Sequence, residues 1–120
     1  LIVVPSCKSG VTVAVDPHKA KGAIAPGHPA ERWRLAKGTP DVPSPLLVGE
    51  VLYIFREKSS LEAYDAKTGK PLFSEVVNNT RNRANPLFVD GKVVLVGREG
   101  DVAVVKPGAT FELLAKNKLP

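Results

Sequence analysis

The 120-residue sequence predicts an all-β protein built from repeated four-stranded antiparallel units. Two observations lead to this prediction. Short segments rich in β-branched and aromatic residues alternate with turns rich in Gly, Asp, Asn and Pro, which is typical of strands joined by tight connections. In addition, one stretch of sequence recurs after about 41 residues. Helix is weakly supported, because Pro and Gly recur too often for a long helical period.

The repeat is visible when Pro45–Glu57 is aligned with Pro86–Glu99, with one residue inserted before Gly91. After each Arg-Glu pair comes a short polar turn and then another alternating strand, Leu61–Tyr64 or Val102–Val105. In repeat architectures each unit buries its faces against its neighbours and is not stable alone. A period near 40 residues with four strands per unit predicts the blades of a β-propeller.

Strand and turn patterns divide residues 1–120 into a single partial propeller domain of just under three blades. We expect a partial blade over residues 1–36 with a loop insertion at 17–30, a blade over 43–77 and a blade over 84–118. The strands predicted for the complete blades are Pro45–Val48, Val51–Arg56, Leu61–Asp65 and Pro71–Val77, then Asn85–Val89, Lys92–Arg98, Val102–Lys106 and Thr110–Lys116. The partial blade supplies Leu1–Pro5, Val11–Asp16 and Arg32–Leu35 and lacks its opening strand.

Residues 63–73 carry the most specific motif of the chain, Ala-Tyr-Asp-Ala-Lys-Thr-Gly-Lys-Pro-Leu-Phe. This segment resembles the blade motif of the quinoprotein-like (PQQ-like) β-propeller repeat family, in which Ala-x-Asp-x-x-Thr-Gly-x-x-x-Trp joins the third and fourth strands. Asp65 and Thr68 are suited to bond the backbone of the turn, Gly69 to adopt a positive φ, and Phe73 to dock between blades. Ala63 opens the motif.

The other two units match this motif less closely. The first resembles it through Ala14-Val15-Asp16 and then carries the insertion 17–30 before Trp33, which takes the place of the docking aromatic residue. The last unit is shortened by two residues before Phe111 and lacks the Asp. We therefore expect Trp33, Phe73 and Phe111 to occupy equivalent docking positions in the three blades.

The resemblance implies a fold shared by dehydrogenases, by scaffolds of the outer-membrane β-barrel assembly machinery and by uncharacterised secreted proteins. It also implies a bacterial protein of the periplasm or the extracellular space. Because unrelated functions share one fold, the resemblance alone does not assign an activity. An arc of fewer than three blades would leave sheet edges unpaired. The expected partners therefore include the remaining blades of a longer chain or other copies of this one.

No catalytic or metal-binding residue is predicted. A resemblance to the quinoprotein dehydrogenases of the family would imply a site with an adjacent cysteine pair, a calcium ion held by carboxylates and a catalytic Asp. This chain has Cys7 as its only cysteine. Its Asp residues stand at turn positions, where Asp bonds its own backbone. His18 and His28 lie in or beside a Pro- and Gly-rich loop, without a spacing that places two ligands on one metal.

Seventeen Lys and Arg against twelve Asp and Glu give a net charge of +5. This charge permits binding of phosphates, anionic glycans or acidic proteins, although a solvated surface explains it more simply. A nucleic-acid platform is disfavoured, because the aromatic residues occupy expected docking or core positions. No apolar stretch approaches the roughly 20 residues of a membrane-spanning helix, so no membrane span is predicted.

The candidate binding residues follow from strand geometry. The turns after the second strands, Arg56-Glu57 and Arg98-Glu99, and the connections 37–42 and 78–84 should lie on one face of a propeller. Four arginines are thereby predicted to share a rim: Arg56, Arg81, Arg83 and Arg98. The repeated Arg-Glu pairs indicate either a ladder of ion pairs between blades or contacts to an anionic ligand, since arginine suits bidentate recognition of carboxylate and phosphate.

Two functions remain open from the sequence. The leading prediction is a non-catalytic binding or scaffold segment of a PQQ-like propeller that mediates interaction with a protein or an anionic ligand, without a cofactor. The alternative is a blade segment of a quinoprotein oxidoreductase whose catalytic residues lie outside this chain. Only this alternative implies PQQ and calcium.

Overall fold

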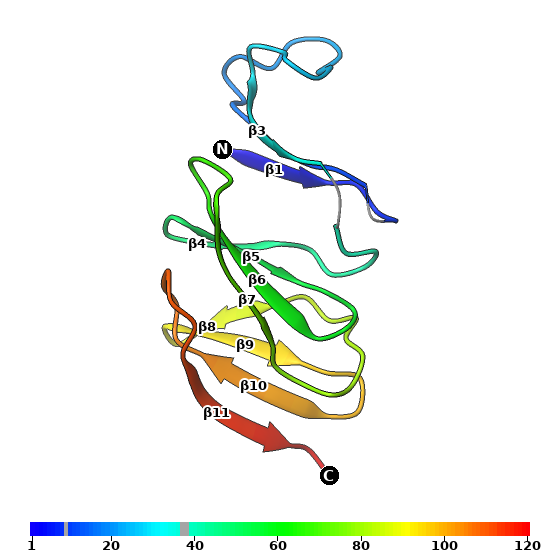
Figure 1. The fold of residues 1–120 in the computed structure, drawn as a ribbon, viewed down its shortest axis with the longest axis vertical. Helices are drawn as coiled ribbons and strands as arrows, with labels where there is room; N and C mark the ends of the chain where they lie inside the picture. The colour runs from blue at the N-terminus through cyan, green and yellow to red at the C-terminus, as the bar shows by residue number, and fades with distance from the viewer. Residues whose placement is uncertain (9, 37–38) are drawn as a thin grey trace.

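The computed structural model describes residues 1–8, 10–36 and 39–120, and within these ranges it contains strands and no helix (Figure 1). Eleven strands of the described part form three antiparallel sheets. The prediction of an all-β protein made of partial propeller blades is confirmed. Among the described residues, no helix is long and apolar enough to cross a membrane.

Each sheet is a meander in which successive strands pair as neighbours. The first sheet has three strands, β1 (Ile2–Pro5), β2 (Thr12–Val15) and β3 (Glu31–Leu35). The middle sheet has four, β4 (Leu46–Val48), β5 (Val51–Phe55), β6 (Ser60–Asp65) and β7 (Pro71–Val76). The third sheet also has four, β8 (Leu87–Val89), β9 (Lys92–Val96), β10 (Asp101–Val105) and β11 (Leu113–Lys118).

The last strand begins later than the repeat predicts. We expected it over Thr110–Lys116, but β11 spans Leu113–Lys118. The backbone N–H of Lys106 donates to the Glu112 carbonyl over 3.0 Å, and the strand register shifts between Val104 and Val105. Residues 106–112 therefore form a longer turn, in which Pro and Gly interrupt the pairing that a strand would need.

The middle sheet is buried on both faces, because the three sheets follow one another along the longest axis of the molecule (Figure 1). On one face, Tyr53 and Phe55 belong to a buried cluster with Val93 and Leu95 of the third sheet. On the other face, Leu52 and Ile54 pack with Ala14 and Trp33 of the first sheet. Burial on both sides explains why β5 is continuously apolar.

The insertion at 17–30 forms a loop without strands at the end of the first sheet (Figure 1). Its two ends are held together, since the backbone N–H of Asp16 donates to the Ala30 carbonyl over 2.8 Å. Ala30 is fully buried, and its own N–H donates to Nδ1 of His28 over 3.0 Å. The loop therefore leaves and rejoins the sheet at one point, next to the register shift between Ala14 and Val15 in the β2–β3 pairing.

Candidate functional site: the strand-end rim

Turns of the middle and third sheets meet a connecting segment at one end of the strands. The backbone N–H of Asn82 donates to the Glu57 carbonyl over 2.8 Å, and that of Arg98 donates to the Arg81 carbonyl over 3.0 Å. The connection 78–84 thus lies between the β5–β6 turn and the β9–β10 turn. The side chains of both turns and of this connection consequently share one rim.

This rim contains two adjoining hollows, which we together call the rim groove. The larger hollow measures about 440 Å³ and the smaller about 240 Å³, and both include Arg81. The larger is lined by Thr39, Asp41, Arg56, Glu57, Lys58, Ser60 and Arg81, and the smaller by Arg81, Arg98 and Glu99. Of the four arginines predicted for the rim, three line the groove, whereas Arg83 is exposed outside both hollows. Lys37 and Gly38 of the predicted rim connection lie outside the described residues.

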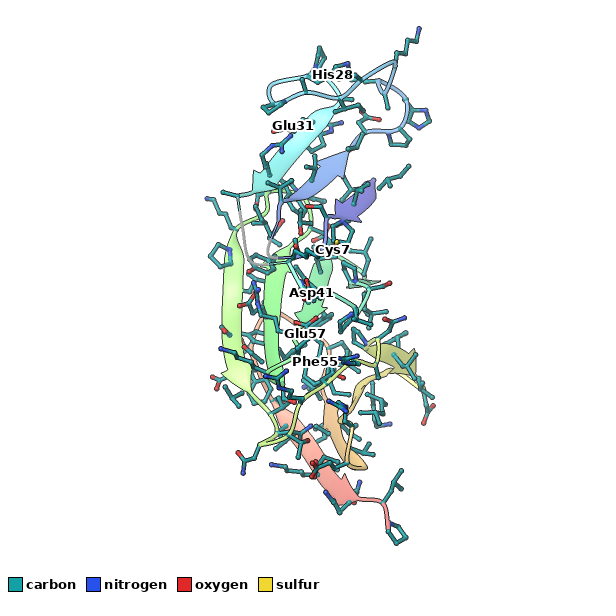
Figure 2. The ribbon with its side chains drawn as sticks, turned by 90° about the vertical axis from the view of Figure 1, so that its right-hand side faces the viewer. Cys7, His28, Glu31, Asp41, Phe55 and Glu57 are labelled. Atoms are coloured by element: carbon teal, nitrogen blue, oxygen red, sulfur yellow. The ribbon has the colours of Figure 1, made fainter. Side chains whose placement is uncertain are left out.

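Two carboxylates of the groove, those of Asp41 and Glu57, accept hydrogen bonds from backbone N–H groups. Oε1 of Glu57 accepts from the N–H groups of Asp41 and Val42, the second over 3.1 Å. Oδ1 of Asp41 accepts from the N–H of Lys8. Asp41 and Glu57 lie near one another on the face that Figure 2 shows. These contacts fasten the connection after the first sheet to the β5–β6 turn.

Arg56 forms an ion pair within its own sheet. Its guanidinium contacts Oε2 of Glu62 over 2.7 Å, and the Tyr64 hydroxyl donates to the same oxygen over 2.8 Å. Burial, together with the neighbouring Glu62 carboxylate, raises the pKa of Tyr64 to about 12. Although burial opposes its charge, the bond to Glu62 raises the pKa of Arg56. Arg56 is therefore a fixed cation in the lining of the groove.

The other basic side chains of the groove are not paired with acids. Within the described ranges, Lys58, Arg81 and Arg98 form no ion pair. No ion pair of the described part joins the two Arg-Glu turns either, so the predicted ladder between blades is not observed. The groove thus presents cations whose hydrogen-bond donors are free for a ligand.

Polar side chains of the connection 78–84 anchor it to the adjacent turns. Oγ1 of Thr80 donates to Oδ2 of Asp101 over 2.6 Å, and Oγ of Ser59 donates to the Thr80 carbonyl. The hydrogen bond from Thr80 lowers the pKa of Asp101 despite partial burial, and Lys118 lowers it by a smaller amount.

Asn78-Asn79-Thr80 has the pattern of an N-glycosylation site. Asn78 is 2% exposed, so this site is closed to modification in the folded chain.

Thr39 and Asp41 belong to the connection 37–42, which strand geometry predicts on the rim, but neither they nor Lys58 were predicted as binding residues. They line the groove because separate connections return to the β5–β6 turn. Which side chains of a connection face the groove depends on the path of the loop. For Lys58, the signal in the sequence is its position directly after the repeated Arg-Glu pair.

The blade motif forms the turn between β6 and β7. Oδ1 of Asp65 accepts from the N–H groups of Lys67 and Thr68 over 2.9 and 3.1 Å, and these bonds, the Thr68 amide first, lower the pKa of Asp65. Gly69 has φ +74°. The indole N–H of Trp33 donates to the Ala66 carbonyl over 2.7 Å, which fastens the first sheet to this turn.

Aromatic side chains connect the middle sheet to the third sheet. The rings of Phe73 and Phe111 meet edge to face with centroids 5.6 Å apart, and Tyr53 lies 6.4 Å from Phe73. The N–H of Gly108 donates to the Tyr53 hydroxyl over 2.8 Å. Fully buried Ala63 pairs with Phe73 in the strand register, which leaves room for these rings. Trp33 and Phe73 therefore lie where blades contact one another, opposite Ala14 and Ala63 in the strand register. Phe111 does not occupy the equivalent position that we expected, because it precedes β11 and packs on the interface that Phe73 already fills.

A further hollow of about 470 Å³ lies at the opposite end of the strands, lined by Leu1, Asp16, Pro17, His18, Arg32 and Lys67. Its acid is already engaged, because Asp16 pairs with Arg32 over 3.0 Å and accepts from the His18 N–H over 3.0 Å. These bonds, the His18 amide first, lower the pKa of Asp16. His28 lies at the far end of the molecule from the rim (Figure 2).

The acidic side chains of the described residues are dispersed and do not form a calcium site. In residues 1–8, 10–36 and 39–120, no three His, Cys, Asp or Glu side chains converge to hold a metal ion. Asp16, Asp65 and Asp101 each accept hydrogen bonds from their own surroundings.

Comparison with known proteins identifies the fold. No family model and no curated protein matches the sequence. A europium-containing methanol dehydrogenase is similar in structure with a TM-score of 0.68 and 18% identity, over 90% of this chain and 21% of that one. BamB from Moraxella catarrhalis is similar with a TM-score of 0.64 and 14% identity, over 98% of this chain and 32% of that one.

The chain thus spans about a fifth and a third of these two proteins. At identities below one fifth the likeness concerns the fold, and their activities do not transfer with it. Both comparisons agree with the propeller fold that the blade motif predicts. The chain has the fold of PQQ-like β-propeller blades.

Proposed function

We propose that this chain is a non-catalytic binding segment of a β-propeller, and that the rim groove receives an acidic segment of a partner protein. The observation that carries the proposal is the state of the charges in the groove. Lys58, Arg81 and Arg98 form no ion pair within the described part, whereas Asp41 and Glu57 accept backbone N–H groups. The unsatisfied donors are therefore predominantly cationic, and a carboxylate is a suitable acceptor for them.

The shape of the groove favours a peptide segment over a small ion. The two hollows adjoin at Arg81 and together run from the β5–β6 turn to the β9–β10 turn. A chain with carboxylates along its length can contact Lys58, Arg81 and Arg98 in succession. Complementary charge of this kind contributes to association rate and specificity. We further propose that the interaction takes place in the periplasm or outside the cell.

The test compares two arginines of one connection. A fluorescein-labelled hexapeptide of alternating Glu and Gly is titrated with the 120-residue chain, and the dissociation constant is measured by fluorescence anisotropy. We expect Arg81→Gln to weaken binding about tenfold, since a hydrogen bond to a charged group contributes about 1.5 kcal/mol. The matched control Arg83→Gln removes an equal charge outside both hollows and should change binding less than about twofold.

Equal weakening by the two variants would mean that net charge, and not the groove, attracts the peptide. A peptide with Gln in place of Glu should not bind measurably. If it binds as well as the acidic peptide, the proposed role of the cations is wrong. Circular dichroism of both variants checks that the fold is retained.

A further inference from the structure

The hairpin turn between β8 and β9 contains the sequence Asp90-Gly91. Val89 and Lys92 flank it as partners in the strand register. Asp90 has φ +49° and Gly91 has φ +71°, and a positive φ at both central residues is what a type I′ turn requires. The turn lies at the end of β9 that is opposite the rim. This site is therefore separate from the rim groove and does not depend on the function proposed for it.

The carboxyl group of Asp90 and the main-chain nitrogen of Gly91 are both accessible in this turn. The Asp90 side chain is 93% exposed, and its partner is the Lys92 ammonium group at 3.5 Å. Among the described residues, the N–H of Gly91 donates to no acceptor. Gly91 also has no side chain that would obstruct the approach of the carboxyl group to the nitrogen. The two groups are thus free to react with one another.

The nitrogen that follows an Asp residue is blocked at the other four such positions, Asp16, Asp41, Asp65 and Asp101. Asp16 precedes Pro17, whose nitrogen carries no hydrogen. The N–H of Val42 donates to a carboxylate over 3.1 Å, and that of Ala66 donates to a carbonyl over 2.8 Å. Val102 lies within β10, which has a partner strand on each side. In the described part of the chain, only Asp90 is followed by a free N–H.

The middle sheet shows that this hairpin accommodates the conformation that such a reaction needs. Attack of the nitrogen on Cγ of Asp90 requires the peptide plane between Asp90 and Gly91 to rotate, which converts a type I′ turn into a type II′ turn. The equivalent turn between β4 and β5 has the type II′ form already, since Gly49 has φ +59° and Glu50 does not have a positive φ. Gly91 suits either form, because glycine adopts φ of both signs.

We propose that Asp90 is a site of spontaneous backbone modification, where aspartate isomerises to isoaspartate through a cyclic succinimide. The Gly91 nitrogen attacks Cγ of Asp90, so that an N–Cγ bond forms, a Cγ–O bond breaks, and water leaves with the N–H proton. Water then adds to the main-chain carbonyl carbon of the ring, and the bond from that carbon to the nitrogen breaks. The chain now continues through Cγ, and no oxidant or other reactant is consumed.

Isoaspartate adds one carbon atom to the main chain between Val89 and Lys92. These residues form the pair of the β8–β9 ladder that closes the turn, and β8 has only three residues. The longer turn cannot keep this pair in its present geometry, so isomerisation loosens the attachment of β8 to β9. Amide hydrogen exchange of Val89, measured by NMR on the isomerised chain, should be correspondingly faster than in the parent chain.

The test measures incorporation of oxygen-18 from labelled water near neutral pH, because each passage through the succinimide adds one such atom. Tryptic digestion in ordinary water then assigns the label to a fragment. Residues 84–92, which contain Asp90, should take up label in the folded 120-residue chain within about tenfold of the rate of a free peptide of the same sequence, since only one peptide plane must rotate. Residues 59–67, which contain Asp65, should label at least about a hundredfold more slowly than their free peptide, since local opening must come first.

Asp90→Glu is the control variant, because it keeps the charge but would need a six-membered ring. It should abolish label uptake in residues 84–92, and circular dichroism checks that its fold is retained. In the parent chain, isoaspartate should appear as a second chromatographic peak of the labelled fragment with equal mass. Equal protection of Asp90 and Asp65 by the fold, uptake that persists in Asp90→Glu, or a labelled fragment without the second peak would each overturn the proposal.

Discussion

Single residues of the blade motif act by allowing sheets to approach closely. The ring of Trp33 lies directly over Gly69, and a Cβ atom built on this glycine would stand 2.8 Å from Cδ2 of the indole. The same glycine has φ +74°, a conformation that costs an L-residue roughly 1–2 kcal/mol. The sequence motif predicted the positive φ, but not that the ring over it comes from the neighbouring sheet.

Gly69→Ala should therefore destabilise the fold by about 2–4 kcal/mol, from backbone strain and from displacement of the indole together. Gly49→Ala is the matched control, because Gly49 has φ +59° and open space around it. The free energy of unfolding of the control should fall by only about 1 kcal/mol. Urea unfolding followed by Trp33 fluorescence measures the free energy of unfolding of both variants. Equal losses in the two variants would show that the indole contact contributes nothing.

At the scale of elements, the connection 78–84 fastens the middle sheet to the third. Its Thr80 donates to Asp101, and this bond is the largest cause of the lowered pKa of that carboxyl. A carboxyl whose pKa is lower in the folded state stabilises the fold above its unfolded pKa of about 3.9. That stabilisation is lost as the pH falls through the lower folded pKa.

Thr80→Val should consequently make the stability of the chain less dependent on pH between about pH 5 and pH 2. The variant moves the pKa of Asp101 back towards its ordinary value, so less stability remains to be lost on acidification. Thr110→Val, in an exposed turn, is the control and should keep the original dependence. Thermal unfolding at a series of pH values measures this dependence. If the stability of Thr80→Val depends on pH as strongly as that of the parent chain, the bond from Thr80 does not lower the pKa of Asp101.

The strands were predictable from the sequence because runs of β-branched and aromatic residues are separated by turns rich in Gly, Asp and Pro. The start of β11 was not, since the last unit lacks the Asp that organises the corresponding turn at Asp65. The rim groove was predictable only in part. Strand geometry brings Arg56, Arg81 and Arg98 to one end, but the carboxylates that accept backbone N–H groups, and the position of Arg83, depend on loop paths.

At the scale of the whole molecule, the outward face of the third sheet repeats an interface that is covered elsewhere. Val94 and Val102 on this face are partly exposed. Their counterparts in the middle sheet, Tyr53 and Leu61, are fully buried against the third sheet. An apolar face of this kind marks a surface for association.

We therefore expect the 120-residue chain to associate in solution, and Val102→Lys to shift its mass towards the monomer value of 12.8 kDa. A buried lysine without a partner opposes association strongly. Val76→Lys, on the exposed outer strand of the middle sheet, should leave the mass unchanged. Light scattering measures all three proteins. A monomeric parent chain, or equal effects of both substitutions, would contradict this assignment.

Burial of the middle sheet on both faces also determines the order in which the chain comes apart. In stacked repeats, stability is close to a sum of unit terms and nearest-neighbour terms, so a unit with two neighbours needs the most free energy to open. The first and third sheets each have one neighbour within this chain. Local opening therefore begins at both ends and reaches β5 and β6 last, which makes the middle blade the template on which the others refold.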